Sequence, residues 1–378
     1  MNILIAPDKF KNSLTSLDAC RAIKNGLIKA SSSFNINVLP LADGGDGLSE
    51  VIQYYTHAKP HVVNVLDPLF RLIKSSLLIS EDRDTAFIEM AKASGLLLLK
   101  PEEYNCMKTT SFGTGELIKK AIELGVKKIV LGVGGSATND CGVGMAAALG
   151  FRFLNKAGKE LLPIGKNLNL IESIDQATLI NLRNISFKIA CDVKNPLCGL
   201  NGATKVYAEQ KGASADDIEH LEAGMLHFSE IITAQLDKSV KDIPGAGAAG
   251  GMGAGCLAFL NAELVSGIDL VLNLSRTEEY IVNADIVFTG EGKIDEQSLE
   301  GKVISGIGQL CKKHQKPLIA FCGNLGLSHN QLQKIYVHSA YSINQDLENS
   351  EDAYKNAERN LTDAAYRIGK KLLGPNFL

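Results

Sequence analysis

The chain has no tryptophan, and several motifs that would assign a function at once are missing from its 378 residues. No Gly-x-x-x-x-Gly-Lys-Ser/Thr segment occurs, which excludes the best-known ATP-binding loop. Neither Cys-x-x-Cys nor His-Glu-x-x-His occurs, so the common zinc patterns are absent. The eight cysteines stand singly in apolar or glycine-rich surroundings, which predicts buried free thiols.

The sequence also lacks an excess of either charge. Its 39 Lys and Arg residues and 42 Asp and Glu residues give a net charge of −3, which offers no surface for nucleic acid. No apolar run approaches the ~20 residues that cross a bilayer, and no basic region precedes the short apolar N-terminus. We therefore expect a cytoplasmic protein without nucleic-acid or membrane partners; homo-oligomer formation is left open.

Short apolar strands alternate with amphipathic helices along most of the chain, which predicts an α/β fold with mainly parallel sheets. The strand–helix units near the two ends resemble each other more than they resemble the glycine-rich middle. We therefore expect one domain formed by residues 1–68 and 282–378, with residues 69–281 inserted as a second domain. In open α/β sheets of this kind, ligands bind beyond the carboxyl ends of the strands.

Glycine is abundant, with 36 residues, and it concentrates in the stretches 132–144, 245–255 and 289–295. Glycine lets backbone N–H groups approach and surround an anion, because it has no Cβ and adopts positive φ readily. The first stretch follows a predicted strand and adds polar side chains. We predict that phosphate groups are bound by Gly134, Gly135, Ser136, Asn139, Gly247, Gly250, Gly251, Gly290 and Lys293.

The segment 245–250 also has the spacing of a dinucleotide-binding fingerprint. That fingerprint requires a preceding apolar strand, and the residues before it here are Lys-Asp-Ile-Pro. An NAD-dependent oxidoreductase is therefore the weaker alternative. Close packing of helices through small residues is a second alternative, and a loop that binds an anion is the favoured interpretation.

Acidic residues end four predicted strands or the loops after them: Asp8, Asp43, Asp192 and Asp295. Carboxylates at such positions can hold Mg²⁺ on nucleotide phosphates or accept the proton of a hydroxyl group, although each one can instead cap a helix. Lys9 and Lys11 follow the first strand, and Arg71 is a further cation that can bind an anion.

Six segments resemble the signature blocks of bacterial glycerate kinases of the first type, in family order across nearly the whole chain: residues 6–14, 40–47, 134–140, 190–199, 245–251 and 289–295. The resemblance implies ATP- and Mg²⁺-dependent phosphorylation of D-glycerate in organic acid catabolism. It also implies a flavodoxin-like domain inserted into a second, Rossmann-like or restriction-enzyme-like α/β domain, with the active site between them. Relatives of this type lean towards 2-phosphoglycerate as product, with 3-phosphoglycerate as the alternative.

Within that reaction we expect Asp192, Asp295 and Lys11 to act in catalysis. Both aspartates are also candidate Mg²⁺ ligands, and the sequence does not decide which of them accepts the proton. Many relatives carry serine in place of Lys9, so Lys11 is the safer choice of cation. The expected substrate-binding residues are Asp8, Lys9, Ser13, Asp43 and Arg71. A sensor that binds glycerate without consuming ATP is a further alternative.

Overall fold

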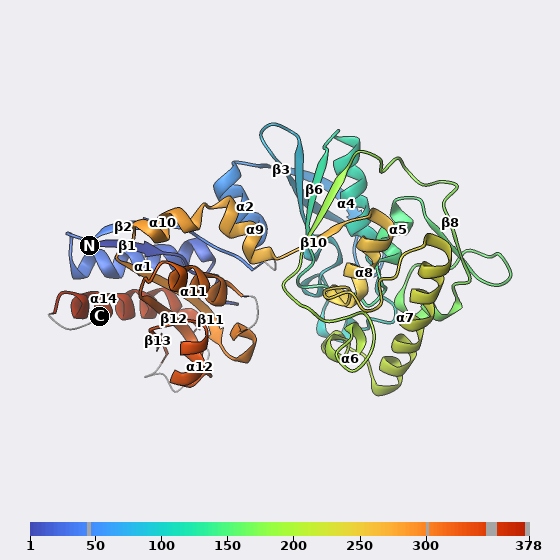
Figure 1. The fold of residues 1–378 in the computed structure, drawn as a ribbon. Helices are drawn as coiled ribbons and strands as arrows, with labels where there is room; N and C mark the ends of the chain where they lie inside the picture. The colour runs from blue at the N-terminus through green and yellow to red at the C-terminus, as the bar shows by residue number, and fades with distance from the viewer. Residues whose placement is uncertain (44–46, 300–301, 345–353, 375–378) are drawn as a thin grey trace. The chain divides into compact units, whose positions relative to one another are not determined.

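The computed structural model describes residues 1–43, 47–299, 302–344 and 354–374, which are drawn as the coloured ribbon in Figure 1. The chain divides into a discontinuous unit, Met1–Asp43 with Ile268–Leu378, and an inserted unit, Gly44–Gly267. Each unit has its own sheet, and parallel pairings predominate in both, which confirms the predicted fold class.

The sheet of the discontinuous unit has five parallel strands in the order β13-β12-β11-β1-β2. Their bounds are β1 Asn2–Ile5, β2 Asn35–Val38, β11 Ile286–Ile294, β12 Leu318–Leu325 and β13 Ser339–Ser342. Numbered within this unit, the order is 2-1-3-4-5, which is the flavodoxin-like order. The flavodoxin-like order was expected in the inserted domain, but the structure has it in the discontinuous unit. The order reverses between β1 and β11, and ligands bind at the carboxyl ends of strands at such a switch point.

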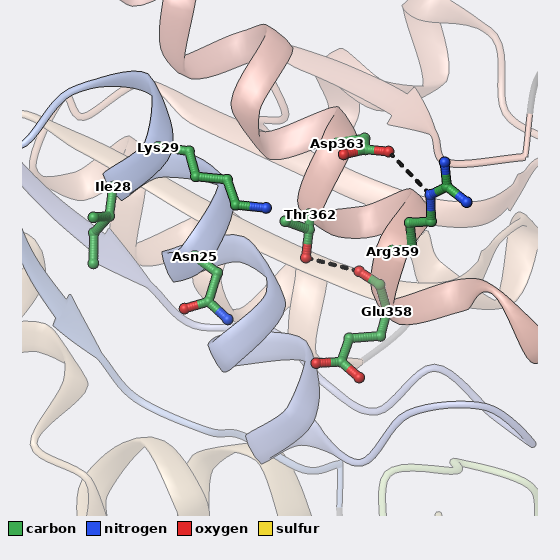
Figure 2. Close-up of a pocket in the computed structure, with 7 residues that line it drawn as sticks. All are labelled: Asn25, Ile28, Lys29, Glu358, Arg359, Thr362 and Asp363. Carbon is green, nitrogen blue, oxygen red and sulfur yellow. Dashed lines mark hydrogen bonds and ion pairs between the residues drawn. The ribbon is translucent and has the colours of Figure 1, made fainter.

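The helices of this unit are α1 Ser16–Ala30, α9 Gly267–Leu274, α10 Thr277–Asn283, η5 Glu296–Leu299, α11 Val303–Lys313, α12 His329–Lys334 and α14 Ala357–Leu372. Helices α1 and α14 approach closely at Gly26. A Cβ there would lie 2.2 Å from the Thr362 carbonyl oxygen, so this approach requires glycine. A pocket of about 450 Å³ lies between these two helices and is lined by Asn25, Ile28, Lys29, Glu358, Arg359, Thr362 and Asp363, whose side chains are drawn in Figure 2.

The sheet of the inserted unit has the order β10-β9-β6-β5-β4-β3. Its strands are β3 Lys59–Leu66, β4 Leu72–Ile79, β5 Thr85–Glu89, β6 Lys128–Gly132, β9 Ser186–Ala190 and β10 Glu263–Val265. The strands β3, β4 and β5 pair antiparallel, and the remaining pairs are parallel. Because β3 pairs with β4 along its whole length, it belongs to this unit. The domain boundaries therefore differ from the expected ones at residues 68 and 281.

The helices of the inserted unit are α2 Leu48–Thr56, α3 Ala91–Ser94, η1 Leu96–Leu98, η2 Pro101–Glu103, α4 Phe112–Glu123, α5 Val143–Ala148, η3 Gly165–Leu170, α6 Ala203–Tyr207, η4 Glu209–Lys211, α7 Ala215–Leu236 and α8 Ala248–Leu260. The strands β7 Arg152–Leu154 and β8 Ser173–Asp175 form a small separate ribbon. Helix α7 has an apolar stripe that lies in the core, where Leu221, Met225 and Phe228 are fully buried.

The eight cysteines are free thiols, and six of them are buried. Burial raises the pKa of each thiol, to about 11 for Cys106 and Cys191. The prediction of buried thiols therefore holds for all except Cys191 and Cys198, which are partly exposed. In the part of the chain that the structure describes, none of the helices combines the length and apolarity needed to span a membrane.

Candidate active site

Acidic side chains gather at the switch point of the five-stranded sheet. Asp8 follows β1, Asp43 follows β2, and Glu291 lies in β11; we call these three residues the carboxyl cluster. Asp8 and Glu291 are each only 5% exposed. The Asp8 N–H donates to the Gly290 carbonyl oxygen at 2.8 Å, which ties the end of β1 to β11. The Ser298 hydroxyl donates to Glu291 Oε1.

Two glycines flank Glu291 and let the chain after β1 pack across β11. A Cβ on Gly292 would lie 2.8 Å from the Lys11 backbone nitrogen, and one on Gly290 would lie 3.2 Å from the Phe10 ring. The Gly-Glu-Gly spacing therefore places Glu291 directly beside the loop that carries Asp8. Close packing accounts for Gly290, and its contact with phosphate stays a prediction.

Burial, together with the nearby Asp43 carboxylate, raises the pKa of Asp8 to about 8 and that of Glu291 to about 7. Lys9 opposes the shift at Asp8, while Ser298 and Lys302 oppose it at Glu291. Glu291 can therefore release and accept a proton near neutral pH, and Asp8 still carries its proton there. Such a pair suits proton exchange with a hydroxyl substrate.

The loop after β1 places the predicted cations beside the cluster. The Lys9 N–H donates to Asp8 Oδ1 at 2.7 Å, and Lys11 has an exposed side chain. The Ser13 hydroxyl donates to the Phe10 carbonyl oxygen at 3.0 Å. Ser13 thus holds the turn together, and its predicted contact with substrate stays a prediction.

Asp295 lies at the end of β11 and caps the following η5 turn. Its Oδ1 accepts the Gln297 N–H at 3.0 Å, and its Oδ2 forms an ion pair with Lys293 at 2.8 Å. Burial raises the pKa of Asp295, but the bonds from Lys293 and Gln297 outweigh burial and lower the pKa below its usual value. Asp295 is therefore an ionised carboxylate.

In the inserted unit, the glycine loop, residues 133–142, connects β6 to α5. The buried Lys211 ammonium donates to Ser136 Oγ at 2.9 Å and to the Thr138 carbonyl oxygen at 2.8 Å. The buried Asp140 carboxylate accepts bonds from the Ser111 N–H and hydroxyl and from two N–H groups of the following turn. These contacts fix the conformation of the loop.

Several polar groups of the glycine loop have no partner within the described residues. The N–H groups of Gly134, Gly135 and Thr138 donate to none of them, and neither Thr138 Oγ1 nor Asn139 Oδ1 finds a hydrogen-bond partner there. Asn139 Nδ2 donates to Thr204 at 3.1 Å. Unsatisfied N–H groups beside an exposed glycine are typical of an anion-binding loop.

The second glycine stretch packs against this loop. A Cβ on Gly250 would lie 2.1 Å from the Thr138 carbonyl oxygen, and one on Gly247 would lie 2.2 Å from the Pro196 carbonyl oxygen. Gly247, Gly250 and Gly251 are all buried, so the packing alternative accounts for them, and their phosphate contacts stay predictions. Turns rather than a strand precede Gly245, so the dinucleotide fingerprint lacks its required context.

Arg71 and Asp192 both have structural partners. The Arg71 guanidinium binds Asp67 Oδ2 and Glu103 Oε1, each at 2.6 Å. Asp192 Oδ1 accepts the Ser266 hydroxyl at 3.0 Å and the Gly267 N–H at 2.9 Å, at the start of α9. Asp192 therefore caps a helix, which is the structural alternative to a catalytic role for such a carboxylate. The catalytic role of Asp192 and the substrate contact of Arg71 stay predictions.

Protein side chains alone do not form a binding site for Mg²⁺ in the part of the chain that the structure describes. Among residues 1–43, 47–299, 302–344 and 354–374, no three His, Cys, Asp or Glu side chains are grouped so that they could hold an ion. Mg²⁺ in phosphoryl-transfer enzymes is usually bound by one or two carboxylates together with substrate phosphates. Such a site is not a protein cage, so Asp192 and Asp295 stay predicted ligands.

Glu291 and Lys211 belong to the candidate site, but they were not predicted from the sequence. The glycines around Glu291 indicated an anion-binding loop, and the carboxylate itself was not among the predicted site residues. Its position in the third glycine stretch, after an apolar strand, was the available signal. Lys211 carries no comparable signal, because it lies 75 residues from Ser136 in the chain.

Comparison with known proteins gives a consistent result. The model of the glycerate kinase family matches residues 3–373. A glycerate kinase of Halalkalibacterium halodurans is 41% identical and covers 97% of both chains, and a glycerate 2-kinase of Escherichia coli K12 is 41% identical and covers 98% of both. A crystal structure described as a glycerate kinase 2 from Salmonella typhimurium LT2 is 39% identical, covers 98% of both chains and has a TM-score of 0.85.

Proposed function

We propose that this chain, which belongs to the glycerate kinase family, transfers the γ-phosphoryl group of ATP to a hydroxyl group of D-glycerate. The observation that carries the proposal is the buried pair of Asp8 and Glu291 at the switch point, with pKa values of about 8 and about 7. The 2-hydroxyl is the proposed acceptor because a glycerate 2-kinase is 41% identical along nearly the whole chain. The proposed context is organic acid catabolism.

In this proposal, the carboxyl cluster binds and activates glycerate. Glu291 accepts the proton of the attacking hydroxyl, because its pKa of about 7 suits a base that works near neutral pH. Asp8, which keeps its proton, donates a hydrogen bond to a second glycerate oxygen. Lys9 and Lys11 on the adjoining loop supply positive charge for the substrate carboxylate.

The glycine loop is the proposed site for the phosphates of ATP. Its unsatisfied N–H groups would surround phosphoryl oxygens, and most of the acceleration of phosphoryl transfer comes from such positioning and charge stabilisation. Mg²⁺ would enter with ATP and reduce the negative charge on the phosphates. Asp192 and Asp295 are the proposed ligands.

A coupled assay for ADP release with D-glycerate tests the function. We expect ADP release that depends on glycerate, with 2-phosphoglycerate identified by phosphorus NMR of the product. Formation of 3-phosphoglycerate would keep the kinase and move the acceptor to the other hydroxyl. Glycerate binding without ADP release would indicate a sensor, and quenching of nicotinamide fluorescence would indicate an oxidoreductase.

Asp295→Asn should lower turnover at least ~100-fold while the protein stays folded, because it removes an ionised carboxylate that is a proposed Mg²⁺ ligand. The asparagine oxygen can still accept the Gln297 N–H. The lost ion pair involves a Lys293 side chain that is 61% exposed, so its loss should have little effect on the stability of the fold. Steady-state kinetics and thermal melts measure both effects, and near-normal turnover would remove Asp295 from the catalytic residues.

A further inference from the structure

We propose that Lys211 is the positioning residue of the glycine loop, and that its buried ammonium holds Ser136 and Thr138 so that the loop can bind a phosphate group of ATP. The inference rests on the proposed function, because it assigns a residue to the ATP site of that reaction. It adds a cation that lies outside all three glycine stretches.

The Lys211 side chain is buried without a carboxylate partner among the described residues. Lys211 is 3% exposed, whereas lysine is almost never fully buried unless it is paired. Its ammonium donates to one hydroxyl and one carbonyl oxygen, and it contacts no carboxylate of the described residues. An isolated buried charge is unfavourable, so this ammonium carries a charge that a bound anion would compensate.

The neighbouring titratable groups compensate that charge only in part. Asp140 attracts Lys211 electrostatically without contacting it, because the Asp140 carboxylate oxygens accept hydrogen bonds from Ser111 and from the N–H groups of Gly142 and Gly144. Burial raises the pKa of the Cys106 thiol to about 11, so this thiol is neutral at physiological pH. Desolvation accordingly lowers the pKa of Lys211 to about 8.

The Lys211 backbone is fixed, so the ammonium has a defined position. Its carbonyl oxygen accepts the Cys106 N–H at 3.2 Å. The next residue, Gly212, has φ +86°, and a Cβ there would lie 2.1 Å from the Tyr104 carbonyl oxygen. Segment 104–106 therefore packs against the turn that contains Lys211 and fixes this turn next to the glycine loop.

Ser136 connects the ammonium to the outer side of the loop. Its Oγ accepts the bond from Lys211, so its own hydroxyl proton is available for another acceptor. A hydroxyl that accepts from a cation is a stronger donor. The adjacent Gly135 is exposed, and its N–H donates to no described residue. The Ser136 hydroxyl and these N–H groups together suit the oxygens of a phosphate group.

The test combines kinetics with calorimetry. Lys211→Met should raise the KM for ATP about 10-fold or more, because it removes a charge-assisted bond, and should leave the KM for glycerate unchanged. In the wild type, binding of MgATP without glycerate should take up protons near pH 8, since the phosphate favours the charged ammonium. Affinity should fall as the pH rises above about 8, and Lys211→Met should lose this dependence.

Two further variants keep the outcome clear. Lys188→Met removes an exposed lysine of the same unit, paired with Glu263 at 3.8 Å, and should leave both KM values at wild-type level. Ser136→Ala should raise the KM for ATP but retain proton uptake. An unchanged KM for ATP in Lys211→Met, or a wild type that takes up no proton near pH 8, would overturn the role of Lys211. The calorimetric result needs no folded variant.

The proposed function and the role of Lys211 fail in different experiments. A wild type that releases no ADP with glycerate would contradict the function. Proton uptake on binding MgATP would still support Lys211 in that case. Conversely, an active kinase whose MgATP binding is independent of pH between 7 and 9 would contradict only the role of Lys211.

Discussion

Replacing Glu291 by glutamine is expected to lower turnover at least ~100-fold, because the substrate hydroxyl loses its proton acceptor. Glutamine has nearly the same shape, and its oxygen can still accept the Ser298 hydroxyl. The loss should therefore fall on kcat, with a smaller effect on the KM for ATP. Steady-state kinetics at neutral pH measures it, and turnover within a few-fold of wild type would exclude Glu291 as the base.

The same substitution should stabilise the fold above neutral pH. The folded-state pKa of Glu291 is raised from 4.5 to about 7, so the folded protein holds a proton that the unfolded chain releases. Its contribution to stability is full below pH 4.5 and is lost as the pH rises through about 7. Glutamine stays neutral, so Glu291→Gln should melt at a higher temperature than the wild type at pH 8, and at a similar temperature in acid.

The neighbouring Glu296 provides the control for both effects. It is exposed on the η5 turn, five residues further along the same segment. Glu296→Gln makes the same chemical change outside the carboxyl cluster and should leave turnover and the pH dependence of melting close to wild type. A similar change in both variants would show that the effect does not depend on the buried position.

The second large effect is expected from Gly250→Ala, which should destabilise the fold by roughly 2–4 kcal/mol. Gly250 has φ +72°, and the new Cβ would lie 2.1 Å from the Thr138 carbonyl oxygen and 2.7 Å from Asn139 Oδ1. The added methyl group must displace the glycine loop, so the KM for ATP should rise as well. Chemical denaturation and kinetics measure the two effects.

Gly158 separates the clash from the backbone strain. It has φ +73°, but no atom lies within 4 Å of a Cβ built there. Gly158→Ala therefore carries only the strain of the left-handed conformation, about 1–2 kcal/mol, and should leave ATP kinetics unchanged. Equal destabilisation by the two substitutions would contradict the packing role of Gly250.

The sequence predicted the α/β class and most elements, because strand and helix periodicity is a local property. The flavodoxin-like order was expected in the inserted unit but lies in the discontinuous one, because strand pairing depends on distant residues that local periodicity does not show. The sequence of residues 335–339 favours a strand, but Tyr336 has φ +59° and the strand there is Ser339–Ser342. Ile335 packs against Gly308 of α11, so its apolar character reflects burial in a turn.

The site shows the same division. Asp8 and Asp43 follow strands, so their gathering at one sheet edge could be predicted from the sequence. Glu291 was missed because the glycines around it were interpreted as an anion-binding pattern, whereas they let the Phe10–Lys11 loop approach. Lys211 could not be found from the sequence, because only the tertiary fold brings it under Ser136.

The buried thiols give each unit a built-in reporter of its own unfolding. Cys20, Cys311 and Cys322 lie in the discontinuous unit, and Cys106, Cys141 and Cys256 lie in the inserted unit. A folded unit shields these groups from alkylating reagents, and their raised pKa keeps them as unreactive thiols, so modification should follow local or global opening. Peptide mapping after timed alkylation in denaturant would therefore show which unit opens first, without any engineered label.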